Sequence, residues 1–267
     1  MSAPAPGKAS PVPPPRRSEP RPPSPALRPS LHRMIVGPAL VATALAALPV
    51  QPAAVPQNHH RAPQAHLGTR LIRPGDTGPQ VRKLQTRLRD LHYDPGAITG
   101  RFGGDTRTAV WAFQKVNKMK PDGVVTARTW TALARPRQPR SIVGHNPPNR
   151  VEINLRKQLL VAYRHGEPAL ISHISTGSGA YYCGATGCGT AHTPTGDFRV
   201  THRIRGWHRS ALGYMYRPLY FFQGYAMHGS TRVPLHPASH GCVRLPLHTA
   251  DVLPHLVGNN ERVYVRG

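Results

Sequence analysis

The sequence has few acidic residues, few aromatic residues and only 3 cysteines among its 267 residues. Asp and Glu number 11 against 35 Lys and Arg, too few for a calcium cage or an acidic interaction tail. Because 39% of the residues are hydrophobic and 6% aromatic, a multi-span membrane protein is excluded. Three cysteines cannot support a disulfide-dense scaffold, and the odd number leaves at least one thiol unpaired.

The excess of basic residues gives a formal net charge of +24. Such a charge predicts attraction to polyanions: nucleic acid, an anionic membrane or an acidic cell envelope. It does not distinguish among them, because charge bears on association and solubility rather than on fold or reaction. The length allows one or two ordinary domains, each with its own core.

The first part of the chain does not read as a folded domain. Residues 1–33 hold 11 of the 31 prolines and several arginines, and we expect this segment to be disordered. Residues 34–54 begin with an uncharged apolar run behind Arg28 and Arg33, which is typical of a signal peptide or a membrane anchor. A buried helix is the alternative. Residues 55–66 read as a linker.

Residues 67–135 predict a small helical module. Gly78 and Pro79 suit the start of a helix, and Thr126 suits the cap of another. Apolar residues recur at helical spacing in three stretches. They are Val81, Leu84, Leu88 and Leu91 in the first, Ala109, Val110, Phe113 and Val116 in the second, and Trp130 and Leu133 in the third. We therefore expect three helices around one small core.

This module resembles the three-helix peptidoglycan-binding family. The residues that carry the resemblance are Gly78, Val81, Leu84, Gln85 and Leu88, then Gly100, Phe102, Thr106, Ala109, Val110, Phe113 and Gln114, then Asp122, Gly123, Val125, Thr129, Trp130 and Leu133. Most of these are core and turn positions, which specify a fold rather than a ligand. A helical spacer is therefore the alternative to a peptidoglycan-binding module.

Residues 136–148 read as a second linker, and residues 149–267 as a mainly β domain. Short β-like runs separated by Gly and Pro lie at 151–155, 158–163, 169–176, 198–202 and 220–227, and the last residues read as a closing strand. One helix is expected over 247–256.

Two short motifs in this domain carry reactive side chains, Met227-His228-Gly229-Ser230 and Ser239-His240-Gly241-Cys242-Val243-Arg244. Acyl transfer at neutral pH needs a thiolate, so a neighbouring imidazole must take the thiol proton. It also needs donors aimed at the tetrahedral oxygen, and amides around Gly241 and Cys242 are natural donors. Either His228 or His240 could be the base on this reasoning.

The region 149–267 also resembles the YkuD-type L,D-transpeptidase catalytic domain. The resemblance is carried by His228-Gly229, by Ser239-His240-Gly241-Cys242-x-Arg244, and by Ser175-Thr176-Gly177 and Thr193-Pro194-Thr195-Gly196 upstream. The gap from His228 to Ser239 is shorter than the commonest family pattern. The resemblance implies cleavage of a peptidoglycan tetrapeptide stem by a cysteine and transfer of its acyl group to a neighbouring stem, forming a 3→3 cross-link.

The same resemblance implies a role for each residue of the motifs. Cys242 would be the nucleophile, and His228 the general base and acid, its other nitrogen held by a backbone carbonyl near Gly229. His240 and Gly241 would shape the oxyanion region. Substrate binding would fall to Arg244, with Ser239 and Gly229 beside it.

Other readings of these residues remain open. Cys242 could be a buried structural cysteine, or His228, His236, His240 and Cys242 could bind zinc, although their spacing fits no common zinc pattern. In an exported chain, Cys183 and Cys188 would form a disulfide, with free thiols or metal binding beside His192 as alternatives.

The sequence thus predicts an α+β protein with a disordered Pro/Arg-rich N-terminus, a three-helix module and a YkuD-like β sandwich. We expect an exported cell-wall L,D-transpeptidase that needs no cofactor or metal. Its expected partners are peptidoglycan stem peptides, anionic cell-wall polymers and carbapenem β-lactams as covalent inhibitors, and not nucleic acid. An L,D-carboxypeptidase, with water as the acceptor, and a non-catalytic cell-wall-binding protein are the alternatives.

Overall fold

The computed structural model describes residues 71–145, 147–184 and 187–267. The expected disordered segment 1–33, the apolar segment 34–54 and the linker 55–66 lie outside the described residues. Within the described ranges, no helix is long and apolar enough to cross a membrane.

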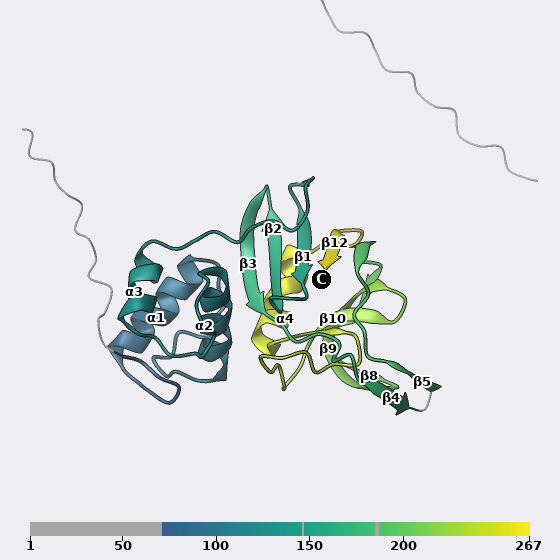
Figure 1. Cartoon of the computed structure of the whole chain (residues 1–267), viewed down its shortest axis with the longest axis horizontal. Coiled ribbons are helices and arrows are strands. Elements are labelled where there is room, and N and C mark those ends of the chain that lie inside the picture. Colours follow the sequence, from purple (N-terminus) through teal and green to yellow (C-terminus); the bar gives the residue numbers. More distant parts are fainter. Residues whose placement is uncertain (1–70, 146, 185–186) are drawn as a thin grey trace, which may run out of the picture. The chain divides into compact units, whose positions relative to one another are not determined.

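The helical module contains α1 (Pro79–Asp90), α2 (Gly104–Val116) and α3 (Ala127–Ala134) (Figure 1). The three predicted helices are therefore confirmed. Pro79 opens α1, where its missing N–H costs nothing. Thr126 caps α3: its side chain accepts from the Thr129 amide, and the Thr129 side chain accepts from the Thr126 amide.

Two buried glutamines hold the turns of the module. Gln85 donates to the Arg101 carbonyl at 3.0 Å and accepts from the Gly100 amide at 2.9 Å. Gln114 holds the next turn: it donates to the Asp122 carboxylate at 2.8 Å and to the Val124 carbonyl at 3.1 Å, and accepts from the Gly123 amide at 3.0 Å. These polar motif positions therefore encode the fold of the module, since their hydrogen-bonding groups face its own backbone.

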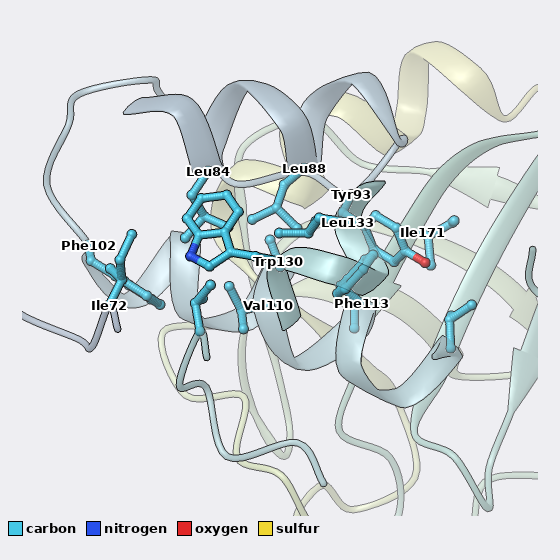
Figure 2. Close-up of a cluster of buried hydrophobic side chains, with 14 of the residues drawn as sticks. Ile72, Leu84, Leu88, Tyr93, Phe102, Val110, Phe113, Trp130, Leu133 and Ile171 are labelled. Atoms are coloured by element: carbon cyan, nitrogen blue, oxygen red, sulfur yellow. The ribbon is translucent and has the colours of Figure 1, made fainter. Parts of the chain in front are cut away.

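The core of the module is not self-contained. Its cluster holds the predicted apolar residues together with side chains of the β domain, namely Leu159, Val161, Tyr163 and Ile171 (Figure 2). Tyr93 packs edge-on against Phe113 at 5.4 Å between ring centres. The expectation of one small core inside the module is therefore corrected: the core extends onto the outer face of a sheet in the next domain.

The β domain is built from two sheets and a separate ribbon (Figure 1). The first sheet has the order β3-β2-β1-β12-β6, and the second β11-β10-β9-β7, with β8 also paired to β9. The ribbon is β4-β5. Their bounds are β1 (Arg150–Asn154), β2 (Leu159–Arg164), β3 (Glu167–His173), β4 (Tyr181–Gly184), β5 (Gly187–Thr190), β6 (Gly196–Arg199), β7 (His202–Arg203), β8 (Trp207–Ser210), β9 (Gly213–Phe222), β10 (Tyr225–Gly229), β11 (Val243–Leu245) and β12 (Arg262–Arg266).

Side chains from both sheets share the second core, together with α4 (Leu247–Leu256). Alternate residues of β2 point to opposite faces, so Leu160 and Ala162 enter this core while Leu159 and Val161 enter the core of the module. An uninterrupted apolar strand of this kind is typical of a sheet buried on both faces. The predicted helical module followed by a β domain is confirmed.

Some predicted strands differ in detail. The single strand expected over 220–227 is interrupted by a turn at Gln223 and Gly224, which joins the end of β9 to the start of β10. Gln223 in this turn has a φ of 44°. The run expected at 198–202 is divided between β6 and β7, which belong to different sheets. The strands β4, β5 and β8 were not predicted, since they lack an apolar alternation.

The segment expected as the linker 136–148 is held at several points. Glu152 accepts from the Ser141 hydroxyl at 2.7 Å and from the Ile142 amide at 2.8 Å. Glu152 also forms a buried ion pair with Arg150 at 2.7 Å. Burying an ion pair is tolerable only when the remaining lone pairs are satisfied, and these contacts from the connection do that.

Candidate active site

The two reactive motifs meet on neighbouring parallel strands. His228 lies in β10, and Cys242 immediately precedes β11. The register pairs Met227 with Val243 and His228 with Arg244. Strand pairing thus brings together two motifs that a loop separates in the sequence.

A cavity of about 490 Å³ opens at this place. It is lined by five of the predicted site residues, His228, Ser239, His240, Cys242 and Arg244. Much of the remaining wall is aromatic or apolar: Tyr182, Leu212, Tyr214, Met215, Tyr220 and Tyr225. Among the described lining residues, Arg244 alone carries a permanent charge, so the cavity favours a ligand with an anionic group.

His228 is oriented by its own strand. Its Nδ1 lies 2.9 Å from the carbonyl of Gly229, which fixes the proton on Nδ1 and leaves Nε2 as a base. The pKa of His228 is lowered to about 4, mainly by burial; the Gly229 hydrogen bond opposes this shift, and the nearby Arg244 contributes to it. The imidazole is therefore neutral and able to accept a proton at neutral pH.

Cys242 is half-buried, and its Sγ lies 3.8 Å from the carbonyl of Gly224. Burial raises the pKa of the Cys242 thiol, while the Ala226 amide and the Arg244 guanidinium act in the opposite direction. In the resting state the cavity therefore holds a protonated thiol and a neutral imidazole. The thiolate would form as substrate is attacked, by proton transfer to His228.

The turn before Cys242 is held by the side chain of Ser239. Its hydroxyl accepts from the Gly241 amide at 3.0 Å and donates to the Cys242 carbonyl at 2.5 Å. The Gly241 carbonyl in turn accepts from Thr193 at 2.6 Å. The Gly241 amide and the Ser239 hydroxyl are thus engaged within the turn, and Ser239 also lines the cavity. The expected roles of Gly241 in the oxyanion region and of Ser239 in substrate binding stay predictions.

Gly229 also has a different place from the one expected. It does not line the cavity, and a Cβ there would lie 2.9 Å from that of Ala250. Its carbonyl orients His228. Gly229 thus supports the imidazole through its backbone, and its expected substrate-binding role stays a prediction.

Gly241 is irreplaceable on steric grounds. Its φ is +140°, and a Cβ would lie 2.6 Å from the ring of Tyr225 and 2.8 Å from the His192 carbonyl. We expect Gly241→Ala to slow acylation of Cys242 about 100-fold, the cost of a misplacement of about 1 Å. Intact-mass kinetics with a carbapenem measure this rate, and Gly224→Ala is the control, because a Cβ there meets nothing within 4 Å. Equal rates for the two variants would contradict the expectation.

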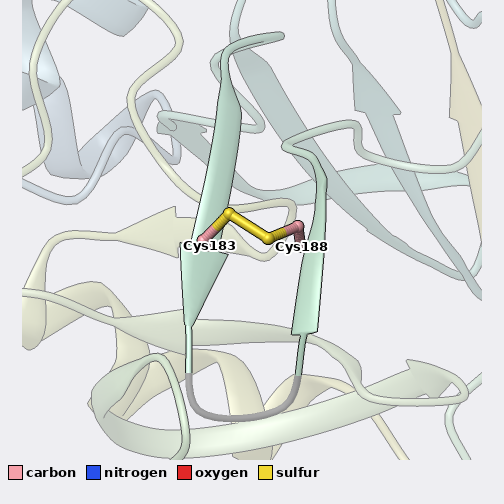
Figure 3. Close-up of a disulfide and its surroundings, with 2 residues drawn as sticks. All are labelled: Cys183 and Cys188. Carbon is pink, nitrogen blue, oxygen red and sulfur yellow. A yellow bond between two sulfur atoms is a disulfide. The ribbon is translucent and has the colours of Figure 1, made fainter.

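The ribbon β4-β5 forms one wall of the cavity. Cys183 and Cys188 are directly opposite each other in it and are joined by a disulfide (Figure 3). Tyr182 lies beside them, lines the cavity and packs edge-on against His240 at 4.9 Å between ring centres. The disulfide therefore fixes the strand that places the Tyr182 ring at the cavity and against His240.

We expect the paired substitution Cys183→Ser with Cys188→Ser to weaken substrate binding more than it affects the thiol. Releasing the ribbon leaves Tyr182 to be ordered on binding, so KM should rise about threefold to tenfold. Alkylation of Cys242 by iodoacetamide should be unchanged. Tyr181→Ala, at a ribbon residue 72% exposed, is the control for the ribbon surface. An unchanged KM in the paired variant would show that the wall does not need the disulfide.

The upstream motifs that contain Ser175 and Thr193 support the backbone of the site. Ser175 exchanges backbone hydrogen bonds with Arg244, at 2.9 and 3.1 Å. Thr193 accepts from the Gly177 amide at 2.9 Å while its hydroxyl donates to Gly241. The sequence motifs that contain Ser175 and Thr193 did not predict a role for each residue. Tyr182 was not predicted to belong to the site, although its position next to a cysteine expected to form a disulfide was a signal in the sequence.

The zinc alternative finds no support in the arrangement. Within the part of the chain that the structure describes, no group of three or more His, Cys, Asp or Glu lies close enough to hold a metal ion. His236 contributes its carbonyl, which accepts from the Ser175 hydroxyl at 2.9 Å.

Comparison with known proteins gives two family matches. Residues 77–133 match the model of the putative peptidoglycan binding domain, and residues 148–265 that of the L,D-transpeptidase catalytic domain. The structure is similar to the crystal structure of an L,D-transpeptidase from Xylanimonas cellulosilytica, with a TM-score of 0.67 and 40% identity, covering 74% of this chain and 98% of that one.

Two curated relatives match shorter stretches. The carboxy-terminal processing protease CtpB of Bacillus subtilis is 42% identical over 53 residues, 20% of this chain and 11% of that protein. An uncharacterized protein in the bpoA1 3′ region of Kitasatospora aureofaciens is 38% identical over 64 residues, 24% of this chain and 54% of that protein. The chain thus covers less than two thirds of either curated relative.

Proposed function

Because this chain belongs to the L,D-transpeptidase family, we propose that it forms 3→3 cross-links in peptidoglycan by cysteine acyl transfer from a tetrapeptide stem. The observation that supports this most is the single cavity shared by a thiol, an oriented imidazole and a guanidinium. A nucleophile, a base and an anion-binding group are what transfer between carboxylate-bearing peptides requires.

The first step would make a thioester. The Nε2 atom of His228 takes the Cys242 proton as the sulfur attacks the carbonyl before the terminal D-alanine. The tetrahedral intermediate then collapses, the carbon–nitrogen bond breaks, and His228 returns the proton to the departing D-alanine amine. Arg244 would bind a carboxylate of the stem, and the exposed imidazole of His240 lies at the same cavity.

The second step would reverse the roles. The amine of a neighbouring stem attacks the thioester, His228 accepts a proton from that amine, and the Cys242 sulfur leaves and regains a proton. A new amide bond replaces the thioester, so no cofactor is required. A β-lactam carbonyl, strained and electrophilic, would be attacked by the same sulfur, which makes carbapenems expected covalent inhibitors.

We further propose that the chain works outside the cytoplasm, with its helical module on peptidoglycan. The disulfide between Cys183 and Cys188 is of the kind that persists in oxidising compartments. The net charge of +24 suits an anionic envelope. A module bound to the wall would raise the local concentration of stems near Cys242.

Product analysis tests the proposal. Purified protein is incubated with a disaccharide-tetrapeptide, and the products are followed by mass spectrometry. We expect a dimer that has lost one D-alanine. Tripeptide monomers without dimers would identify an L,D-carboxypeptidase instead, and unchanged substrate would point to a non-catalytic wall-binding protein.

A further inference from the structure

A second histidine, His173 at the end of β3, lies outside the reacting groups described above. It is 0% exposed, and its ring nitrogens have partners on two sides. Nε2 lies 3.2 Å from the carbonyl of Val233 and 3.0 Å from that of Pro234. Nδ1 lies 2.7 Å from Nζ of Lys115, which is on α2 of the helical module.

The partners of His173 define its protonation state. Lys115 has only donors to offer while charged, and its Nζ also donates to the Gln158 carbonyl at 2.9 Å. Two carbonyl oxygens face Nε2, so the ring proton lies there and Nδ1 accepts from Lys115. Burial lowers the pKa of Lys115 to about 7, and a neutral amine can still donate to both Nδ1 and the Gln158 carbonyl. Burial, with the adjacent Lys115, lowers the pKa of His173 to about 3, in keeping with a neutral ring.

The two carbonyls belong to the loop that joins the catalytic motifs. Residues 230–238 connect His228 to Ser239, and their far end is held by backbone bonds from the Ala238 and Ser239 amides to Thr176, each 2.9 Å long. The Val233–Pro234 stretch lies earlier in the loop, and Pro234 has no amide to donate. Its carbonyls are held by His173.

We propose that Lys115 of the helical module is a positioning residue for this loop and acts on it through His173. Lys115 fixes the His173 tautomer and the ring orientation, and His173 fixes the segment that leads into the Cys242 turn. Trp111, on the same helix, packs edge-on against the His173 ring at 5.2 Å and limits its rotation. The helical module thus positions the loop of the proposed active site, in addition to the wall-binding role proposed above.

The effect of Lys115 on acylation rests on the proposed function. The effect of Lys115 on the order of the 230–238 loop does not. Hydrogen exchange of the loop tests it without reference to any reaction. The full-length wild-type protein is compared with the variants Lys115→Met and Lys120→Met. Lys120 is exposed and follows α2, so its substitution removes the same charge without touching His173.

We expect Lys115→Met to speed amide exchange in the peptide covering 230–238 about fivefold, the factor that one hydrogen bond is worth. Lys120→Met should match the wild type. His173→Gln, which keeps a donor near the position of Nε2, is expected to protect the loop better than His173→Ala. Unchanged exchange in Lys115→Met, or faster exchange throughout the β domain, would overturn the inference.

A second readout separates positioning from folding. Lys115→Met should slow acylation of Cys242 by a carbapenem about tenfold, because a loosened loop misplaces the turn, while alkylation by iodoacetamide stays at the wild-type rate. A fall in both rates would indicate a general structural role and contradict positioning. If the wild type itself is not acylated, the proposed function fails, and the exchange experiment still decides the inference.

Discussion

Replacing Cys242 with alanine is expected to abolish covalent acylation and cross-link formation completely. Among the described residues it is the one free cysteine, because Cys183 and Cys188 are bonded to each other. Its sulfur lines the same cavity as His228, the imidazole that the Gly229 carbonyl orients. The fall in turnover should reach the detection limit of a dimer assay, and thermal unfolding should be nearly unchanged because the side chain is small and half-buried.

The control for this variant is Tyr181→Ala, at an exposed residue of β4 that does not line the cavity. Tyr181→Ala should acylate at close to the wild-type rate. Dimer formation by Cys242→Ala would refute the assignment of the nucleophile, and a loss of folded protein in that variant would require a repeat with Cys242→Ser.

Replacing His228 with asparagine is expected to slow acylation by about 10²- to 10⁴-fold, the usual contribution of a general base. The asparagine amide nitrogen can occupy a position close to that of the histidine Nδ1, but the amide group cannot take a proton from Cys242. Because the wild-type imidazole has a pKa of about 4, its acylation rate should fall as the pH drops through that value. The variant should lose this acid limb.

His240→Asn serves as the comparison for this experiment, since His240 is exposed at the same cavity. Its effect should be smaller, because no backbone carbonyl orients its ring among the hydrogen bonds described. A larger loss in His240→Asn than in His228→Asn would move the base to His240. Unchanged pH dependence in His228→Asn would contradict the same assignment.

The sequence was sufficient to single out the proposed reacting residues because their motifs are local. Cys242 and His228 stand in short motifs with glycines, and parallel pairing of β10 with β11 brings the two motifs together. The helices of the module were predictable for a similar reason: apolar spacing and the cap at Thr126 are properties of neighbouring residues.

What the sequence could not provide are the contacts between distant segments. The run Leu159–Tyr163 is apolar at every position, a sign of burial on both faces, but nothing local says that the helical module covers one of them. The hydroxyl of Ser239 could have faced a substrate. Its two partners lie within its own turn, and only the backbone conformation at Gly241 reveals that.

His173 is the clearest case of a residue without a sequence signal. It ends a strand, has no glycine or cysteine beside it, and lies 58 residues from Lys115 and 61 from Pro234. Its partners come from three separate parts of the chain, which only the folded structure brings together. Positioning residues of this kind are recognised from the burial and the tautomer of their side chains in the structure, and not from a sequence motif.

Intact-mass measurement with a carbapenem decides whether the sulfur of Cys242 becomes acylated with help from His228. We expect a single adduct of one intact carbapenem mass, mapped by peptide digestion to Cys242, formed quickly in the wild type and absent from Cys242→Ala. No adduct on the wild type, or an adduct on any other residue, would contradict this expectation.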